Sequence, residues 1–292
     1  MRGVFHVPGR MLASAAAAFL VAFPASAQVA ATPPPEFGWK NSANGTVNVS
    51  QAYFDNWAKG GTNTLTWEGR LEGVALRKEA DWDWESKARA VYGQSRLDGL
   101  GTRKASDELL LETAYTRKVS AWINPFASAK LQSQFAAGYA YNDSAGTKTR
   151  VSGAFDPTYL TQTVGLGKSW ADAYKVRVGG SLKETFSAAR YGYADDDATA
   201  SVETFKLEPG ASFTAEMRRP VMENILLVSV FDVFANFKGS DEVDLRWENN
   251  ITAKVNALVS VNAALEVLYD KDLSTKRQVR QTLAVGVSFL RI

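Results

Sequence analysis

Apolar and polar residues alternate over long segments of this chain, and the last segment shows the pattern clearly. Val279, Leu283, Val285, Val287 and Phe289 fall on one face of an extended strand, and polar or small residues fall on the other. A helix would scatter these apolar residues around its axis, whereas a pleated strand collects them on one side. The same alternation predicts an all-β protein of twelve strands, over residues 46–53, 64–77, 82–94, 107–117, 121–141, 158–170, 174–188, 204–217, 222–237, 242–254, 255–269 and 279–289.

Two architectures produce such strands. In a soluble sandwich or lipocalin-like barrel the apolar face points into the core, whereas in a transmembrane barrel it meets lipid. Most segments reach the roughly 9–11 residues that a tilted strand needs to cross a bilayer. Connections also alternate in length, as they do in outer-membrane barrels. Long connections are expected at 54–63, 95–105, 142–156, 189–202 and 270–276, with 238–241 compact, and short ones at 78–80, 118–120, 171–173, 218–221 and 254–256. We therefore expect a transmembrane antiparallel up-and-down β-barrel.

The N-terminal residues predict a cleaved secretory signal. Arg2 and Arg10 form a basic start, an apolar stretch follows over 11–23, and Ala25-Ser26-Ala27 matches a cleavage site. An apolar core of 13 residues is shorter than the roughly 20 that a membrane-spanning helix needs. Export through the general secretory pathway to the outer membrane of a Gram-negative cell is therefore expected. The predicted divisions are a signal peptide (1–27), a Pro-rich linker (28–38) and the outer-membrane barrel (39–292).

Aromatic residues gather near both ends of the predicted strands. Amphipathic rings prefer the headgroup zone, so two interfacial girdles are expected, although aromatic residues also favour strands in general. The predicted girdle residues are Trp82, Trp84, Trp170, Tyr174 and Phe289 at the periplasmic end, and Tyr53, Trp67, Tyr92, Tyr139, Phe205 and Tyr269 at the outer end.

One motif carries a family resemblance. The segment 51–63, Gln-Ala-Tyr-Phe-Asp-Asn-Trp-Ala-Lys-Gly-Gly-Thr-Asn, resembles the opening motif of an uncharacterised outer-membrane barrel family catalogued as domain of unknown function 3078. The later stretches 247–249, 258–262 and 268–270 resemble its closing strands. The resemblance implies an outer-membrane barrel, with outer-membrane lipid and the barrel-assembly machinery as partners, and it implies no substrate. The chain ends on an alternating strand similar to the assembly signal, except that three residues follow Phe289.

Composition removes several classes of function. The chain has no Cys and a single His, His6, which lies in the predicted leader. Histidine-based triads, thiol nucleophiles and most transition-metal sites are therefore excluded from the mature part, and we expect no enzyme, metal or cofactor. Without the leader, Lys plus Arg equals Asp plus Glu at 31 each, so no basic field suggests nucleic acid.

Three local features could bind a ligand or catalyse a reaction, and each also has a simpler structural interpretation. Asp81 and Asp83 form a carboxylate pair of the kind used in acid–base catalysis, but Lys87 and Arg89 lie nearby to pair with them. The run 195–197 of three Asp offers oxygen ligands for a divalent cation, although it lacks the spacing of a calcium loop. The Gly60-Gly61 pair fits a turn better than a phosphate loop, because no helix follows it.

The predicted inward face carries charges of both signs. If the lumen is wet, these charges shape ion passage, and the protein is a passive channel for small hydrophilic solutes. If opposite charges pair across the lumen, the barrel is plugged and its role is structural, adhesive or in envelope assembly. Both functions stay open, as does a soluble binding barrel. The expected lumen residues are Glu68, Arg70, Glu72, Asp81, Asp83, Glu85, Lys87, Arg89, Lys175, Arg177, Lys183, Asp244, Arg246 and Glu248.

Overall fold

The computed structural model describes residues 37–56, 58–59, 61–195, 199–238, 243–270 and 274–291. The predicted signal peptide (1–27) lies outside these residues, and so does the predicted linker up to residue 36. Gly38, which was assigned to the linker, is the first residue of a strand. In the part of the chain that the structure describes, no helix is long and apolar enough to cross a membrane.

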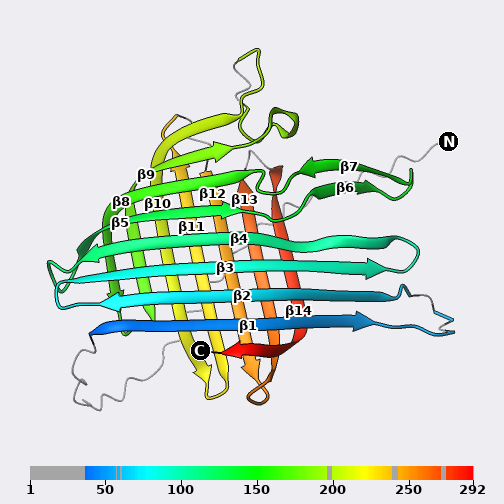
Figure 1. The fold of residues 1–292 in the computed structure, drawn as a ribbon, viewed down its shortest axis with the longest axis horizontal. Coiled ribbons are helices and arrows are strands. Elements are labelled where there is room, and N and C mark those ends of the chain that lie inside the picture. Colours follow the sequence, from blue (N-terminus) through cyan, green and yellow to red (C-terminus); the bar gives the residue numbers. More distant parts are fainter. Residues whose placement is uncertain are drawn as a thin grey trace, which may run out of the picture. The chain divides into compact units, whose positions relative to one another are not determined.

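Twelve strands close into an antiparallel barrel, which confirms the predicted fold class (Figure 1). Neighbours along the chain pair with each other, β5 pairs directly with β8, and β1 pairs with β14. The barrel strands are β1 (Gly38–Ala52), β2 (Thr64–Lys78), β3 (Trp82–Leu97), β4 (Gly101–Arg117), β5 (Asn124–Ser133), β8 (Thr158–Trp170), β9 (Tyr174–Phe186), β10 (Phe205–Met222), β11 (Ile225–Asn236), β12 (Val243–Lys254), β13 (Val259–Asp270) and β14 (Ser274–Arg291).

The predicted strand 121–141 is wrong as a single element. It divides into β5 and β6 (Gly138–Asn142), and β6 pairs with β7 (Thr147–Ser152) in a separate hairpin. The division has a local cause, because the Asp107 carboxylate accepts hydrogen bonds from the main-chain amides of Phe135 and Ala136, at 2.7 and 2.8 Å. Those amides are therefore unavailable to a sheet ladder. The hairpin occupies most of the predicted loop 142–156.

The two ends of the barrel differ in their connections. At the turn end, strands are joined across 79–81, 118–123, 171–173, 223–224 and 255–258. At the loop end, the long connections are 53–63, 134–157 and 187–204, the last with a short 3-10 turn, η1 (Ala189–Tyr191). The long loop predicted at 95–105 is wrong, because β3 and β4 continue to a tight turn over 98–100. Gly99 and Gly101 have φ of 76° and 79° there, which residues with a Cβ rarely adopt.

The apolar faces of the strands point outward. Val285, Val261 and Phe213 are 52%, 37% and 37% exposed, whereas the polar side chain of Thr185 is 1% exposed. In a soluble barrel this distribution would be reversed. The soluble interpretation is therefore wrong, and the exterior is that of a barrel that crosses a membrane.

The seam that closes the ring is short. β1 and β14 share six residue pairs, from Asn44 to Val49, whereas β1 and β2 share fifteen. A bulge lies between Gly45 and Thr46. The Phe289 ring lies over Gly45, so a Cβ at this position would come within 2.6 Å of the ring and would require the ring to move.

Candidate functional site

The candidate site is the charged lumen. Strand alternation directs thirteen of the fourteen predicted lumen residues inward. Among them, Asp83 lies near the turn end and pairs with Lys118 at 2.6 Å. The exception is Asp81. It lies in the turn before β3 and pairs with Arg117 while both side chains are more than half exposed, so its assignment to the lumen is corrected.

The central cluster joins opposite walls of the barrel. Arg89 on β3 reaches Glu248 on β12 at 2.9 Å, and Arg246 on β12 reaches Glu108 on β4 at 2.7 Å. Four strands separate β3 from β12 on the shorter way round the ring, so these side chains cross the lumen. Its six members are Arg89, Glu108, Arg246, Glu248, Glu266 and Arg280, three cations and three carboxylates, with Arg246–Glu266 at 3.0 Å and Arg280–Glu266 at 2.8 Å.

The turn-side cluster repeats this arrangement one layer nearer the turn end. Lys87 on β3 reaches Glu216 on β10 at 2.5 Å, and Arg177 on β9 reaches Glu112 on β4 at 3.0 Å. Four strands again separate β3 from β10. The members are Glu85, Lys87, Glu112, Lys175, Arg177 and Glu216, again three of each sign, and Glu85 pairs with both Lys175 and Arg177.

Further pairs hold the same walls together. Lys130 on β5 contacts Asp232 on β11 at 2.8 Å, and Lys183 on β9 contacts Asp244 on β12 at 2.6 Å. The other predicted lumen residues pair along one strand, where Arg70 contacts Glu68 at 3.2 Å and Glu72 at 3.3 Å.

A small cavity lies beside the central cluster. The cavity bounded by Glu68, Arg89, Glu108 and Glu248 measures about 20 Å³, which is room for about one water molecule. Charges withdrawn from bulk water are stable only when they are paired, and removing one partner costs more than the intact pair contributes. The two clusters therefore join opposite walls of the barrel at two levels.

Sequence reasoning missed five of the twelve cluster members. Glu108, Glu112, Glu216, Glu266 and Arg280 complete the clusters, although none was predicted as a lumen residue. The signal was present, because each carboxylate occupies the inward face of an alternating segment. Which carboxylate meets which cation depends on pairing across the barrel, and alternation along one strand contains no information about it.

The proposed carboxylate pair for catalysis is not assembled, because Asp81 and Asp83 pair with different cations. Of the three Asp at 195–197, the last two lie outside the described residues. Elsewhere in the described ranges, no group of three His, Cys, Asp or Glu side chains is placed to hold a metal ion.

Aromatic side chains occupy the outward face near both ends. Trp82 stacks on Tyr115 at 5.8 Å and Trp170 on Tyr174 at 5.4 Å, at the turn end. Trp84 and Phe289 lie at this end as well, 49% and 63% exposed. At the loop end, Trp67 packs edge-on against Tyr92 at 6.0 Å and Phe186 lies 5.1 Å from Phe205, while Tyr53 and Tyr269 lie at or just beyond strand ends. Tyr139 requires correction, because it belongs to the β6–β7 hairpin and not to a barrel strand.

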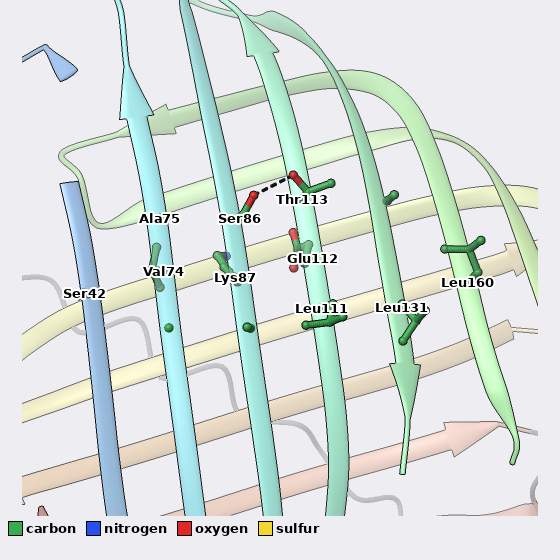
Figure 2. Close-up of a pocket in the computed structure, with 13 residues that line it drawn as sticks. Ser42, Val74, Ala75, Ser86, Lys87, Leu111, Glu112, Thr113, Leu131 and Leu160 are labelled. Atoms are coloured by element: carbon green, nitrogen blue, oxygen red, sulfur yellow. Dashed lines mark hydrogen bonds between the residues drawn. The ribbon is translucent and has the colours of Figure 1, made fainter. Parts of the chain in front are cut away.

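The outward face is hollowed beside the turn-side cluster. Small residues on β2 and β3 leave a depression of about 620 Å³, and Leu111, Leu131 and Leu160 form its apolar rim on β4, β5 and β8 (Figure 2). Its polar groups satisfy each other, since Ser86 and Thr113 share a hydrogen bond of 2.9 Å and Trp84 donates to Thr113 at 2.8 Å. Lys87 and Glu112 belong to the same wall. Lys87 reaches across the lumen to Glu216 on β10, and Glu112 contacts Arg177 on β9.

The closed ring, the outward apolar face and the charged lumen together define a transmembrane β-barrel. A family model described as a protein of unknown function (DUF3078) matches residues 49–139. This match begins two residues before the 51–63 motif and includes all of it, and it confirms the resemblance to that family over this part of the chain. No curated protein sequence matches the chain.

Solved structures of other outer-membrane proteins are similar in fold at low identity. The translocator domain of the autotransporter NalP from Neisseria meningitidis is 11% identical, with a TM-score of 0.40, over 88% of this chain and 90% of that one. The COG4313 outer membrane channel from Pseudomonas putida F1 is 13% identical, with a TM-score of 0.38, over 87% and 96%. The KdgM porin is 9% identical, with a TM-score of 0.31, over 85% and 99%.

Proposed function

We propose that this protein is an outer-membrane barrel whose lumen is closed at rest, and that it serves the envelope through its outer surfaces instead of as an open diffusion channel. The observation that carries this proposal is the pairing of charges between opposite walls at two levels, with about 20 Å³ of open space beside the central cluster. A hydrated ion needs a continuous water-filled path, and side chains that pair across the lumen at two levels block such a path.

The outer membrane is the location that fits the exterior. A closed ring leaves few unpaired main-chain groups, and the outward face is apolar between aromatic ends. The predicted signal peptide supports export through the general secretory pathway, and outer-membrane lipid and the barrel-assembly machinery are the partners that such a barrel requires. No described group of residues supports a catalytic role.

Conductance in planar bilayers tests the proposal. We expect the parent protein to give no discrete current steps, and the combined variant Arg89→Ala, Arg246→Ala, Lys87→Ala, Arg177→Ala to give them, because each cluster loses two of its three cations and its contacts across the lumen. Variants with only one cluster altered are expected to stay silent. Arg77→Ala is the matched control, because Arg77 pairs with Glu79 outside the lumen. A shift in gel migration on boiling reports that each variant is folded.

The passive channel for small hydrophilic solutes is the competing function. The charges of both signs on the inner face favour this channel function. Dissolved salt screens ion pairs that water can reach, and weakened pairs would let the lumen open. Discrete current steps from the parent protein would overturn the closed barrel and favour the channel. Silence from both the parent and the folded combined variant would show that groups other than these clusters close the lumen, and it would overturn the role assigned to them.

A further inference from the structure

The loop end carries a group of cations that differs from those of the lumen. Lys148 and Arg150 lie on β7 and Arg190 lies in η1, and all three side chains belong to exposed residues. Across the residues that the structure describes, none of the three forms an ion pair with a carboxylate. We call Lys148, Arg150, Arg190 and the rings of Tyr139 and Tyr191 the outer cationic cluster.

Tyrosine rings hold these cations in place. The guanidinium carbon of Arg190 lies 4.8 Å from the centre of the Tyr191 ring, and that of Arg150 lies 5.9 Å from the same ring. The Lys148 ammonium lies 4.8 Å from the centre of the Tyr139 ring. Two guanidinium groups therefore share one aromatic platform, although their like charges repel each other.

The backbone beneath the cluster is well anchored. Tyr193 donates a hydrogen bond to the Val151 carbonyl at 3.0 Å, which ties the 187–204 connection to β7. The Asp156 carboxylate accepts hydrogen bonds from the Ser187 hydroxyl at 2.8 Å and from the Ala188 amide at 3.2 Å. Asp156, the nearby carboxylate, is thus engaged with groups other than the arginines. Burial, with a further contribution from Asp156, raises the pKa of Tyr193.

We propose that the outer cationic cluster binds the phosphate group of a phosphorylated saccharide. Two exposed guanidinium groups beside one ring, neither in an ion pair with a described carboxylate, favour phosphate because their planar N–H donors match its oxygens. The Nε of Arg150 donates to the Ser152 carbonyl at 3.1 Å, so its terminal N–H groups are the donors that a phosphate would meet. Aromatic rings beside them provide flat apolar surfaces against which the C–H face of a sugar can pack. The site lies at the loop end, so its ligand is the headgroup of a glycolipid in the outer leaflet or a free sugar phosphate.

Binding to the folded, full-length mature barrel in detergent tests this site. The soluble probe is glucose 1-phosphate, with glucose as its uncharged counterpart, and the lipid probe is a vesicle containing lipid A, with a vesicle lacking it as the reference. We expect Arg150→Gln with Arg190→Gln to weaken binding at least about tenfold, since two charge-assisted contacts to the phosphate are lost. Arg96→Gln is the matched control, because Arg96 is an exposed arginine on β3 outside the cluster.

Conservative variants separate recognition from folding. Arg150→Lys with Arg190→Lys keeps both charges, so it should preserve the hairpin and bind between the parent and the Gln variant. Binding of the vesicle alone supports a membrane headgroup as the ligand, and binding of glucose 1-phosphate supports a free sugar phosphate. The proposal is overturned if neither phosphorylated probe binds, if glucose binds as well as its phosphate, or if Arg96→Gln weakens binding as much as the double Gln variant. These binding experiments do not measure conductance, so their failure would leave the proposal of a closed lumen unaffected.

Discussion

Cations of the lumen and cations of the loop end differ in what holds them. Arg177 in the turn-side cluster has 9% of its side chain exposed and contacts three carboxylates, whereas Arg190 in the outer cationic cluster is exposed and lies on a tyrosine ring. A charge withdrawn from bulk water is costly unless it is paired, while an exposed charge is already stabilised by hydration. The comparison shows that the same residue types join opposite walls of the lumen in one region and stay exposed beside aromatic rings in the other.

The largest expected effect comes from breaking a cluster in the lumen. Glu248→Leu removes the partner of both Arg89 and Arg246, so we expect the free energy of unfolding to fall by about 3 kcal/mol. Urea unfolding from lipid vesicles, followed by tryptophan fluorescence, measures it. Glu72→Leu is the matched control, because Glu72 is 43% exposed and contacts Arg70 along the same strand. Equal losses in both variants would contradict the distinction between buried and exposed pairs.

An added charge on the outward face should have the next largest effect. Val178 is 52% exposed in the middle of β9, and Val178→Arg should destabilise the barrel by about 2 kcal/mol if lipid covers that position. Val151→Arg on the β6–β7 hairpin should have almost no effect, because Val151 is 39% exposed and lies at the loop end, outside the barrel wall. The same unfolding assay compares the two. A small effect at Val178 would place that face in water.

Exchanging two charges sharpens the comparison further. Arg89→Glu and Glu248→Arg should each destabilise alone, and together they should recover part of the loss, because the pair across the lumen is restored with reversed polarity. A coupling energy of at least about 1 kcal/mol is expected from the double-mutant cycle. Additive losses would mean that these two side chains do not act as a pair.

Removing a cation of the outer cationic cluster should barely affect folding. Arg150→Gln is expected to change the free energy of unfolding by less than about 0.5 kcal/mol, since the residue is exposed and has no carboxylate partner within the described ranges. Thermal unfolding of the purified barrel measures this. A loss similar to that of Glu248→Leu would place Arg150 among the groups that hold the fold together.

The smallest effect concerns one exposed pair near the same hairpin. A hydrogen bond from Arg103, at 3.2 Å for one of its nitrogens, holds the pKa of Asp143 below its ordinary value. A lowered folded-state pKa means that the contribution of this pair is present above the ordinary Asp pKa and is lost as pH falls through the folded value. NMR titration of Asp143 should show a low midpoint that returns towards the ordinary value in Arg103→Gln. An unchanged midpoint would show that the hydrogen bond is not maintained.

Alternation along the strands made the barrel predictable. Val285 and Phe213 lie outward and the charged positions lie inward because strand side chains alternate strictly, and this required no long-range information. The β6–β7 hairpin was not predictable, because a side chain 28 positions earlier, Asp107, interrupts the ladder by binding the amide of Phe135. The turn at 98–100 was missed because two strands continue beyond the apolar segment from which they were recognised.

The sequence predicted most of the residues that line the lumen, but it did not predict which of them contact each other. Arg89 and Glu248 were both expected on the inward face, yet 159 positions separate them in the chain, and only closure of the ring brings them together. Their contact therefore depends on strand number and stagger, which a one-dimensional pattern does not specify. The outer cationic cluster depends in the same way on a connection between β9 and β10 that carries no regular period.

The short seam between β1 and β14 has a consequence for how the ring comes apart. Six residue pairs join the first and last strands, far fewer than the fifteen that join β1 to β2, so a force applied across the wall meets the fewest main-chain hydrogen bonds at this junction. Separation of the strands should therefore begin at the seam between β1 and β14. The opened barrel would be a curved sheet whose two edge strands are β1, which is synthesised first, and β14, which is synthesised last.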